Sequence, residues 1–170
     1  VGSEMCIRDR LRSDSIYEGL KYIMRDDPEE TIGIVLVHDA ARCFAPAELF
    51  STVTERVRTI MSQNVAAGVV PALPVVDTIK MVDSSGNVLG TPDRTRLRRV
   101  QTPQGFDAKL LWTLHQEARK EGLSTTDDAA LLEKFQFGVA TVPGDEKALK
   151  ITTPTDLRLA QFIMEEDAEG

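Results

Sequence analysis

Two long apolar runs constrain the fold of this chain more than any other feature. The first extends from Ile32 to Val37, and the second is VAAGVVPALPVV, whose Pro71 and Pro74 mark its end. Strands that are apolar at successive positions are typical of sheets covered on both faces. The first run therefore predicts a central strand of a parallel sheet, and a helix from about Pro46 to Ser62 follows it. This order of strand, helix and strand predicts an α/β layer fold.

Helical periodicity and capping residues predict the remaining regular elements. Thr153, Pro154 and Asp156 have the spacing of a helix start: a capping residue, a proline at the first helical position and an acid three residues after the cap. A threonine is likewise expected to cap the helix in TTDDAALLEKFQ. The predicted elements also include helices at 14–24 and 105–122 and a strand at 138–144. Without a repeat or linker, the sequence predicts one domain over residues 11–170.

The segment from Asp77 to Gln104 interrupts the alternation of strands and helices. Two stretches, DTIKMVD and NVLGTPDR, flank Ser84, Ser85 and Gly86, which predicts two strands joined by a tight turn. A two-stranded ribbon is only marginally stable alone in water. We therefore expect this ribbon to lie on its own sheet or on a partner subunit.

Composition excludes several classes of protein. The chain has 170 residues, a net charge of −7 and a pI of about 4.9, which argues against a general nucleic-acid binder with a basic surface. Cys6 and Cys43 provide neither a disulfide framework nor metal-ligand spacing. No apolar run approaches the length of a membrane span. The sequence predicts a soluble, cytoplasmic protein without a membrane partner.

Two clusters could bind an anionic ligand. In HDAAR, at 38–42, Asp39 and Arg42 follow a predicted strand, where α/β proteins bind ligands, and the two alanines between them leave room for a sugar. Alternatively, Asp39 caps the next helix and Arg42 lies on the surface. In DRTRLRRV, the alternating arginines 94, 96 and 98 would share one face if the segment is extended. Alternatively, they protect an edge strand against aggregation.

Lys150 is the third candidate, because it lies just before a predicted helix N-terminus, where backbone N–H groups favour phosphate. A solvated lysine is the alternative. The three clusters together indicate a phosphate-bearing sugar or polyol held between two strand ends and the ribbon. We expect His115 to lie on the surface of its helix, and Thr126, Asp127 and Asp128 to form a helix cap.

Six motifs occur in an order that resembles the 2-C-methyl-D-erythritol 4-phosphate cytidylyltransferase family. The resemblance extends from Arg12 to Met164 and implies a three-layer, Rossmann-like nucleotidyltransferase sheet. It also implies a projecting β-hairpin arm, from Asp77 to about Gln101, that is exchanged between the subunits of a homodimer. The motifs are RSDSIYEGL, VLVHDAAR, VPALPVVDTIK, DRTRLRRVQTPQGF, STTDDAALLEKFQFGV and LKITTPTDLRLA.

The resemblance also implies roles for individual residues. Arg94, from the other subunit, and Lys150 match the catalytic residues that hold the polyol phosphate. Asp39 and Thr78 match residues of its pocket, and Ile151 and Thr152 lie beside the lysine. The expected nucleotide-binding residues are Arg12, Ser15, Asp39, Ala40 and Arg42.

The implied reaction is an in-line attack by a phosphate oxygen of methylerythritol phosphate on the α-phosphorus of CTP, with Mg²⁺ bridging the triphosphate. Such transfers depend mainly on positioning and charge stabilisation. Ala148 replaces a frequent asparagine of the family, and Cys43 replaces a frequent proline. The alternatives are a ribitol 5-phosphate or other polyol-phosphate cytidylyltransferase, and a noncatalytic polyol-phosphate binding domain.

The opening segment, Val1 to about Arg10, is expected to be foreign to the protein. Its first nine residues, VGSEMCIRD, equal the translation of a transposase-based sequencing adapter. Members of the resembled family begin with a βα unit whose Gly-rich loop cradles the triphosphate, and this segment contains no such loop. We therefore expect an enzyme fragment that lacks its first βα unit and is inactive by itself.

Overall fold

A mixed five-stranded sheet forms the centre of the computed structural model, which describes residues 12–27, 29, 31–123 and 125–169. The opening segment from Val1 to Arg10 lies outside the described residues. The sheet has the order β1, β6, β2, with β7 on the far side of β2 and β5 beside the end of β2. The strands are β1 (Ile34–Val37), β2 (Gly68–Pro74), β5 (Arg98–Val100), β6 (Gln104–Asp107) and β7 (Val139–Pro143).

The first apolar run does not form the central strand of a parallel sheet, as the sequence predicted. Within the described residues, β1 pairs with β6 alone, and it does so antiparallel, with Val35 opposite Phe106. The central strand is β2, which pairs parallel with β7 and antiparallel with β5 and β6. An apolar run indicates that both faces of a strand are buried. It does not indicate which strands pair with it or in which direction they run, because these depend on the path of the chain through the fold. β1, β2 and β7 nevertheless run in one direction, so their carboxyl ends lie at one edge.

Pro71 lies inside β2, although the sequence suggested that it would mark the end of that strand; Pro74 is the last residue of β2. Pro71 has no N–H group to donate, and it lies between the part of β2 that pairs with β6 and the part that pairs with β5. Its carbonyl accepts a hydrogen bond from the Gln101 N–H at 2.8 Å. The proline therefore fits at the point where β2 changes partner.

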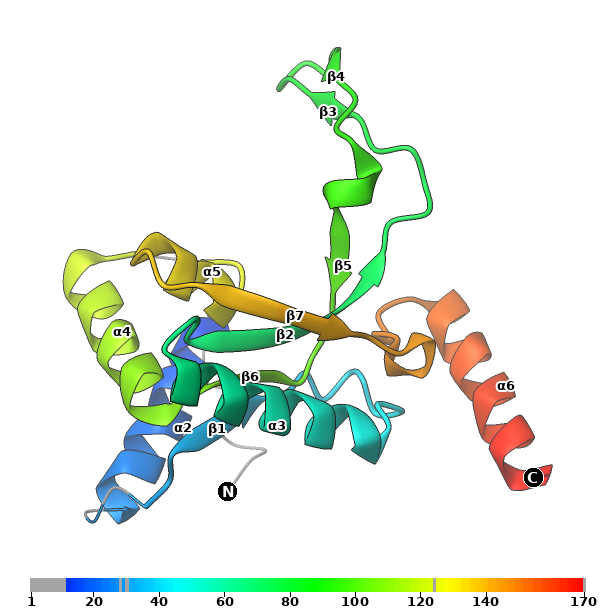
Figure 1. Ribbon diagram of the computed structural model, residues 1–170. Coiled ribbons are helices and arrows are strands. Elements are labelled where there is room, and N and C mark those ends of the chain that lie inside the picture. The colour runs from blue at the N-terminus through cyan, green and yellow to red at the C-terminus, as the bar shows by residue number, and fades with distance from the viewer. Residues whose placement is uncertain (1–11, 28, 30, 124, 170) are drawn as a thin grey trace.

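Helices cover both faces of the sheet, which confirms the three-layer α/β fold (Figure 1). Alternate residues of β6 face opposite ways: Phe106 is fully buried towards α2, α4 and α5, and Gly105 faces α3. The α3 side chains Val53 and Val57 fill the second core. The covering helices are α2 (Arg12–Asp26), α3 (Ala47–Gln63), α4 (Ala108–Glu121) and α5 (Asp128–Lys134), whereas α6 (Pro154–Glu169) stands beside the sheet (Figure 1).

Two local predictions need correction. Residues Gln104–Asp107, partly assigned to a helix, form strand β6, and the Asp107 side chain caps α4 by accepting a hydrogen bond from the Leu110 N–H. The cap of α5 is Asp127 rather than a threonine. Gln104, Gly105 and Phe106 are all buried because β6 lies between two cores on opposite faces of the sheet, so no local polar–apolar periodicity marks this strand.

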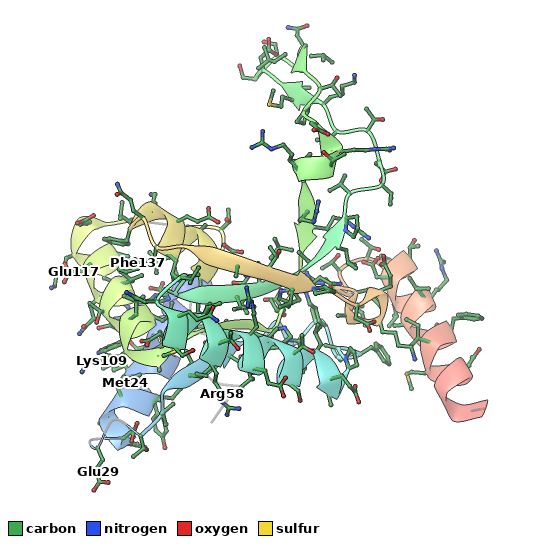
Figure 2. All side chains as sticks on the ribbon, viewed as in Figure 1. Met24, Glu29, Arg58, Lys109, Glu117 and Phe137 are labelled. Carbon is green, nitrogen blue, oxygen red and sulfur yellow. The ribbon has the colours of Figure 1, made fainter. Side chains whose placement is uncertain are left out.

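The ribbon predicted between Asp77 and Gln104 projects from the end of the sheet as an arm (Figure 1). Its tip is a two-stranded sheet of β3 (Met81–Val82) and β4 (Val88–Gly90), closed by a turn in which Gly86 has a φ of 85°. Apolar side chains of both strands are exposed, and Figure 2 shows the side chains standing out on either side of the ribbon. None of the described helices is both long and apolar enough to cross a membrane.

Candidate functional site

Three segments meet at the edge where β1, β2 and β7 end. Asp39 and Arg42 follow β1, Thr102 lies between β5 and β6, and Lys150 follows the short 3-10 helix η2 (Glu146–Ala148) after β7. Ligands of open α/β sheets bind beyond the carboxyl ends of their parallel strands. The structure therefore confirms that the HDAAR segment follows a strand and that Lys150 lies just before the start of α6.

Lys150 and Asp39 form the central ion pair of the site. The Lys150 Nζ lies 3.0 Å from the Asp39 Oδ2, and the two side chains are 47% and 18% exposed. The Ile151 N–H donates to the Ala41 carbonyl at 2.8 Å, which joins the lysine segment to the loop after β1. A partly exposed lysine in this position can exchange its carboxylate for an incoming anion.

Arg42 acts as a clamp between three segments. Its Nη1 donates to the Ala148 carbonyl at 2.7 Å, and its Nη2 lies 3.5 Å from the Val100 carbonyl. Its Nε lies 3.8 Å from the Asp39 Oδ2. Burial lowers the pKa of the Arg42 guanidinium from its ordinary value, and the Asp39 carboxylate opposes that shift. Arg42, expected near the nucleotide, thus holds the loops that carry Asp39 and Lys150.

Thr102 positions Asp39, a role that the sequence did not reveal. Its Oγ1 accepts a hydrogen bond from the Asp39 N–H at 3.0 Å and lies 3.0 Å from the His38 Nδ1. The His38 Nε2 lies 3.3 Å from the Arg42 carbonyl. The network is satisfied if Nε2 carries the proton and the threonine hydroxyl donates to Nδ1. The sequence TPQGF marked this region, but nothing in it pointed to His38 as the partner.

Gln101 is a second residue that sequence analysis missed. Its buried side chain donates from Nε2 to the Asp145 carbonyl at 2.8 Å and accepts from the Asp145 N–H at 3.0 Å. The same Nε2 lies 3.2 Å from the Ala148 carbonyl. These bonds fix the segment before Lys150 to the sheet, and so they set the position of the lysine.

A hollow of about 280 Å³ opens beside this framework. Three cations border it, together with two carboxylates, so a small anion would meet several donors there. The Arg99 guanidinium bonds to the Glu146 carboxylate on its rim, at 3.1 Å. The lining residues are Arg42, Leu73, Arg99, Val100, Gln101, Glu146, Leu149, Lys150 and Asp156.

Arg94 and Thr78 belong to the segment between β2 and β5 that forms the arm (Figure 1), whereas Lys150 follows η2. Arg94 belongs to the 3-10 helix η1 (Arg94–Arg96), and its Nη1 donates to the Val76 carbonyl at 2.9 Å. The predicted extended face of alternating arginines is therefore wrong. Asp93 caps η1 by accepting from the Thr95 N–H, which bends the segment out of an extended conformation.

The expected nucleotide-binding residues are divided between two places. Ala40 lies next to Asp39 in the loop after β1, whereas Arg12 and Ser15 belong to α2, which packs against α4. Tyr17 of α2 stacks on Trp112 with ring centroids 5.1 Å apart. The structure therefore does not bring Ser15 to the Lys150 pair by a direct contact among the described residues.

Thr152 is exposed, and it donates from both its N–H and its hydroxyl to the Asp156 carboxylate.

His115, expected on the surface, is in fact 5% exposed, and its Nε2 lies 2.8 Å from the buried Asp128 Oδ1. Helix α5 folds over α4 and covers this face, which no pattern within α4 indicates. No group of three or more potential metal-binding side chains occurs among the residues that the structure describes.

Comparisons with known proteins agree with this architecture. The family model "IspD: 2-C-methyl-D-erythritol 4-phosphate cytidylyltransferase" matches residues 9–166. A protein of that name from Microcystis aeruginosa is 47% identical over 153 residues, which are 90% of this chain and 63% of the relative. The corresponding protein of Nostoc punctiforme is 43% identical with the same coverage. The chain therefore spans about 63% of the length of these curated relatives.

Solved structures of similar proteins share the fold. The structure of 4-diphosphocytidyl-2C-methyl-D-erythritol synthase from Anaerococcus prevotii has a TM-score of 0.80 and 31% identity, covering 92% of this chain and 65% of that one. The 2-C-methyl-D-erythritol 4-phosphate cytidylyltransferase of Thermus thermophilus has a TM-score of 0.76 and 34% identity, covering 92% of this chain and 71% of that one.

Proposed function

The chain belongs to the 2-C-methyl-D-erythritol 4-phosphate cytidylyltransferase family, and from this we propose that the protein transfers CMP from CTP to 2-C-methyl-D-erythritol 4-phosphate, as a step of isoprenoid precursor synthesis. The observation that best supports this activity is the Lys150–Asp39 pair beside a small basic hollow, at the carboxyl ends of three strands that run in one direction. A phosphate and the hydroxyl groups of a polyol would be bound there by a cation and a carboxylate respectively.

The proposed reaction needs no covalent enzyme intermediate. A phosphate oxygen of the polyol phosphate forms a bond to the α-phosphorus of CTP, while the bond from that phosphorus to the oxygen bridging to the β-phosphate breaks. Pyrophosphate leaves with the electron pair of the broken bond. Cations close to the reacting phosphates reduce the repulsion between nucleophile and triphosphate, so their positions determine the rate.

We assign the roles of the residues as follows. Lys150 holds the attacking phosphate, and Asp39 and Thr78 line the polyol pocket, beside Ile151 and Thr152. Arg94 completes this pocket from the arm of a second subunit. For the nucleotide, Ala40 contacts the ribose, Ser15 the cytosine end, and Arg12 and Arg42 lie near the phosphates. The motifs of the family at these positions of the sequence support the assignments.

A homodimer that exchanges arms would cover the exposed apolar side chains of the arm and would bring Arg94 and Thr78 to an active site. The arm exposes Met81, Val82, Val88 and Leu89, which a partner would cover. Arg94 and Thr78 belong to the arm and are not among the residues that line the hollow at Lys150, so they would serve the partner's site. A cytoplasmic location is consistent with an exposed free thiol at Cys43.

Mg²⁺ is proposed to enter with CTP rather than to occupy a protein cage. The described residues contain no cluster of three or more metal-binding side chains. Magnesium typically binds through substrate phosphates and keeps several waters. The ion would therefore neutralise part of the triphosphate charge, and the chain's own residues would position the polyol phosphate.

Release of pyrophosphate tests the activity. Because the chain spans about 63% of the Microcystis aeruginosa relative, the assay uses a protein in which the remaining segment of that relative is joined to residues 12–170. We expect pyrophosphate release that requires both CTP and 2-C-methyl-D-erythritol 4-phosphate and is abolished by Lys150→Ala. A preference for ribitol 5-phosphate would replace the proposed substrate. Binding of the polyol phosphate without turnover would favour a noncatalytic binding domain.

A further inference from the structure

Arg99 lies on the rim of the hollow that contains Lys150, but the motifs of the sequence assign no role to it. It belongs to β5, where it is opposite Leu73 of the central strand, so its backbone is fixed. Its Nη2 lies 3.1 and 3.4 Å from the two carboxylate oxygens of Glu146. The side chains of Arg99 and Glu146 are 52% and 77% exposed.

The three cations of the hollow differ in how readily they could bind a ligand. Arg42 is 13% exposed and donates to backbone carbonyls, so it cannot turn towards a ligand without releasing two loops. Lys150 is paired with Asp39. Arg99 is held by an exposed carboxylate, and exposed ion pairs contribute little to stability. Arg99 can therefore leave Glu146 and bind a phosphate at little cost in free energy.

We propose that Arg99 is a specificity-determining residue that binds the phosphate group of the polyol phosphate from the same subunit as Lys150. In the absence of ligand, Glu146 holds Arg99 at the rim. When the ligand binds, the planar guanidinium donates two parallel hydrogen bonds to phosphate oxygens, a geometry that a neutral polyol cannot match. This inference rests on the proposed function, because it assumes that the hollow receives the polyol phosphate.

The neighbouring Arg98 provides a matched control. Its Nη1 donates to the carbonyls of Thr95 and Leu97 within the base of the arm. Successive residues of a strand point to opposite faces, so Arg98 and Arg99 cannot reach the same ligand. Arg98 has the same charge, the same strand and similar exposure, yet it is not among the residues that line the hollow.

The test is calorimetric titration of the 170-residue chain with 2-C-methyl-D-erythritol 4-phosphate and, separately, with unphosphorylated 2-C-methyl-D-erythritol. We expect Arg99→Gln to weaken binding of the phosphate ligand about fivefold and to leave the weak binding of the neutral polyol unchanged. Glu146→Gln should tighten phosphate binding about threefold, because it releases Arg99. Arg98→Gln should bind like the wild type, and the urea unfolding midpoint of each variant verifies that it is folded.

The double variant Arg99→Gln, Glu146→Gln distinguishes this mechanism from a general effect of charge. If Glu146 acts by holding Arg99, the double variant binds as weakly as Arg99→Gln alone. Tightening by Glu146→Gln in the absence of Arg99 would overturn the proposal, as would equal effects of Arg98→Gln and Arg99→Gln, or a wild-type chain that does not bind the phosphate ligand.

The test of Arg99 and the test of the proposed function can fail independently of each other. Loss of binding in Lys150→Ala with no change in Arg99→Gln would remove the role of Arg99 and leave the proposed function intact. Pyrophosphate release by the joined protein decides the proposed function independently of the titration.

Discussion

Arg42 joins more of the candidate site than any other single side chain that we have described. It contacts carbonyls that are 58 and 106 residues away in the sequence, and its Nε faces Asp39. An arginine can hold two carbonyls at once because its donors have a fixed planar arrangement. The Arg42 side chain is only 13% exposed, so its part-buried bond to the Ala148 carbonyl contributes more than a surface contact would.

Arg42→Lys should therefore destabilise the chain, although it keeps the charge. An ammonium group replaces the planar fork, so it cannot bond both the Ala148 and the Val100 carbonyl as Arg42 does, at a cost of about 1 kcal/mol. Urea denaturation followed by circular dichroism measures the change. The control is Arg58→Lys, on the outer side of α3, where the side chain is exposed (Figure 2). Unchanged stability would mean that Arg42 acts on ligands alone.

Gly105 permits α3 to approach the sheet closely. A Cβ atom at this position would lie 2.6 Å from the Val53 Cγ1 and 2.8 Å from the Val57 Cγ2. Gly105→Ala should lower the free energy of unfolding by about 1–3 kcal/mol, because the helix must shift or the valines must leave their rotamers.

Gly19→Ala contrasts with Gly105→Ala, because a side chain at position 19 has room. Gly19 lies within α2, and a Cβ atom there would meet nothing within 4 Å. This variant should gain about 0.5–1 kcal/mol from the higher helix propensity of alanine. The same denaturation experiment measures both variants, and equal destabilisation by the two would refute the account of close packing at Gly105.

At the scale of elements, the start of α6 is defined by a reciprocal capping box, which confirms the sequence prediction. The Asp156 N–H donates to the Thr153 Oγ1 at 3.2 Å, and the Thr153 N–H donates to the Asp156 Oδ2 at 2.7 Å. Together with the donors of Thr152, these bonds lower the pKa of the Asp156 carboxyl from its ordinary value of 3.8; the Thr152 N–H has the largest effect. The box fixes the helix directly after Lys150.

The capping box predicts a pH-dependent contribution to stability. Because the folded state lowers the pKa of Asp156, its stabilisation is fully present above pH 3.8 and is lost as the pH falls through the lower, folded value. Asp156→Asn should therefore have a lower urea midpoint than the wild type at pH 7, and the difference should shrink below pH 3.8.

Glu165→Gln serves as the control for the capping prediction, since it removes a carboxylate from an exposed position of the same helix. It should not reproduce the pH-dependent difference. A difference between Asp156→Asn and the wild type that is constant from pH 7 to the acidic range would show that the charge of Asp156 does not act through the cap.

At the scale of the whole molecule, the arm separates residues that the proposed chemistry requires together. Arg94 and Thr78 belong to the arm, which projects from the end of the sheet (Figure 1), whereas Lys150 follows η2. Exchange of arms around a two-fold axis would place each arm at the partner's site, because a symmetric dimer repeats every contact twice.

Mixing two inactive variants tests this exchange. Arg94→Ala and Lys150→Ala are each expected to be inactive in the pyrophosphate assay of the joined protein. If the two residues act in one site from different subunits, each mixed dimer contains one intact site. Joint refolding of equal amounts should then restore about a quarter of the wild-type activity.

A site formed within one chain predicts a different activity for the mixture. If Arg94 and Lys150 serve the same site from one chain, every site of a mixed dimer lacks one of them, and the mixture stays inactive. Size-exclusion chromatography of the mixture verifies that dimers form, so absence of recovery in a dimeric sample would rule out arm exchange.

The sequence by itself determined the local elements. Periodicity and caps depend on residues a few positions apart, so α2, α3 and the Thr153 box were predicted close to their observed bounds. The HDAAR segment was predicted to follow a strand and Lys150 to precede a helix start, and both are observed, for the same reason. These features are encoded by neighbours in the sequence.

Only the tertiary structure decided which segments meet. The sequence did not indicate that β6 lies antiparallel between β1 and β2, that Thr102 positions Asp39, or that α5 buries His115. The Thr102 contact joins residues 63 positions apart. Strand direction and such partners depend on where the chain returns after forming its cores, since burial on two faces can be satisfied by parallel or antiparallel neighbours alike.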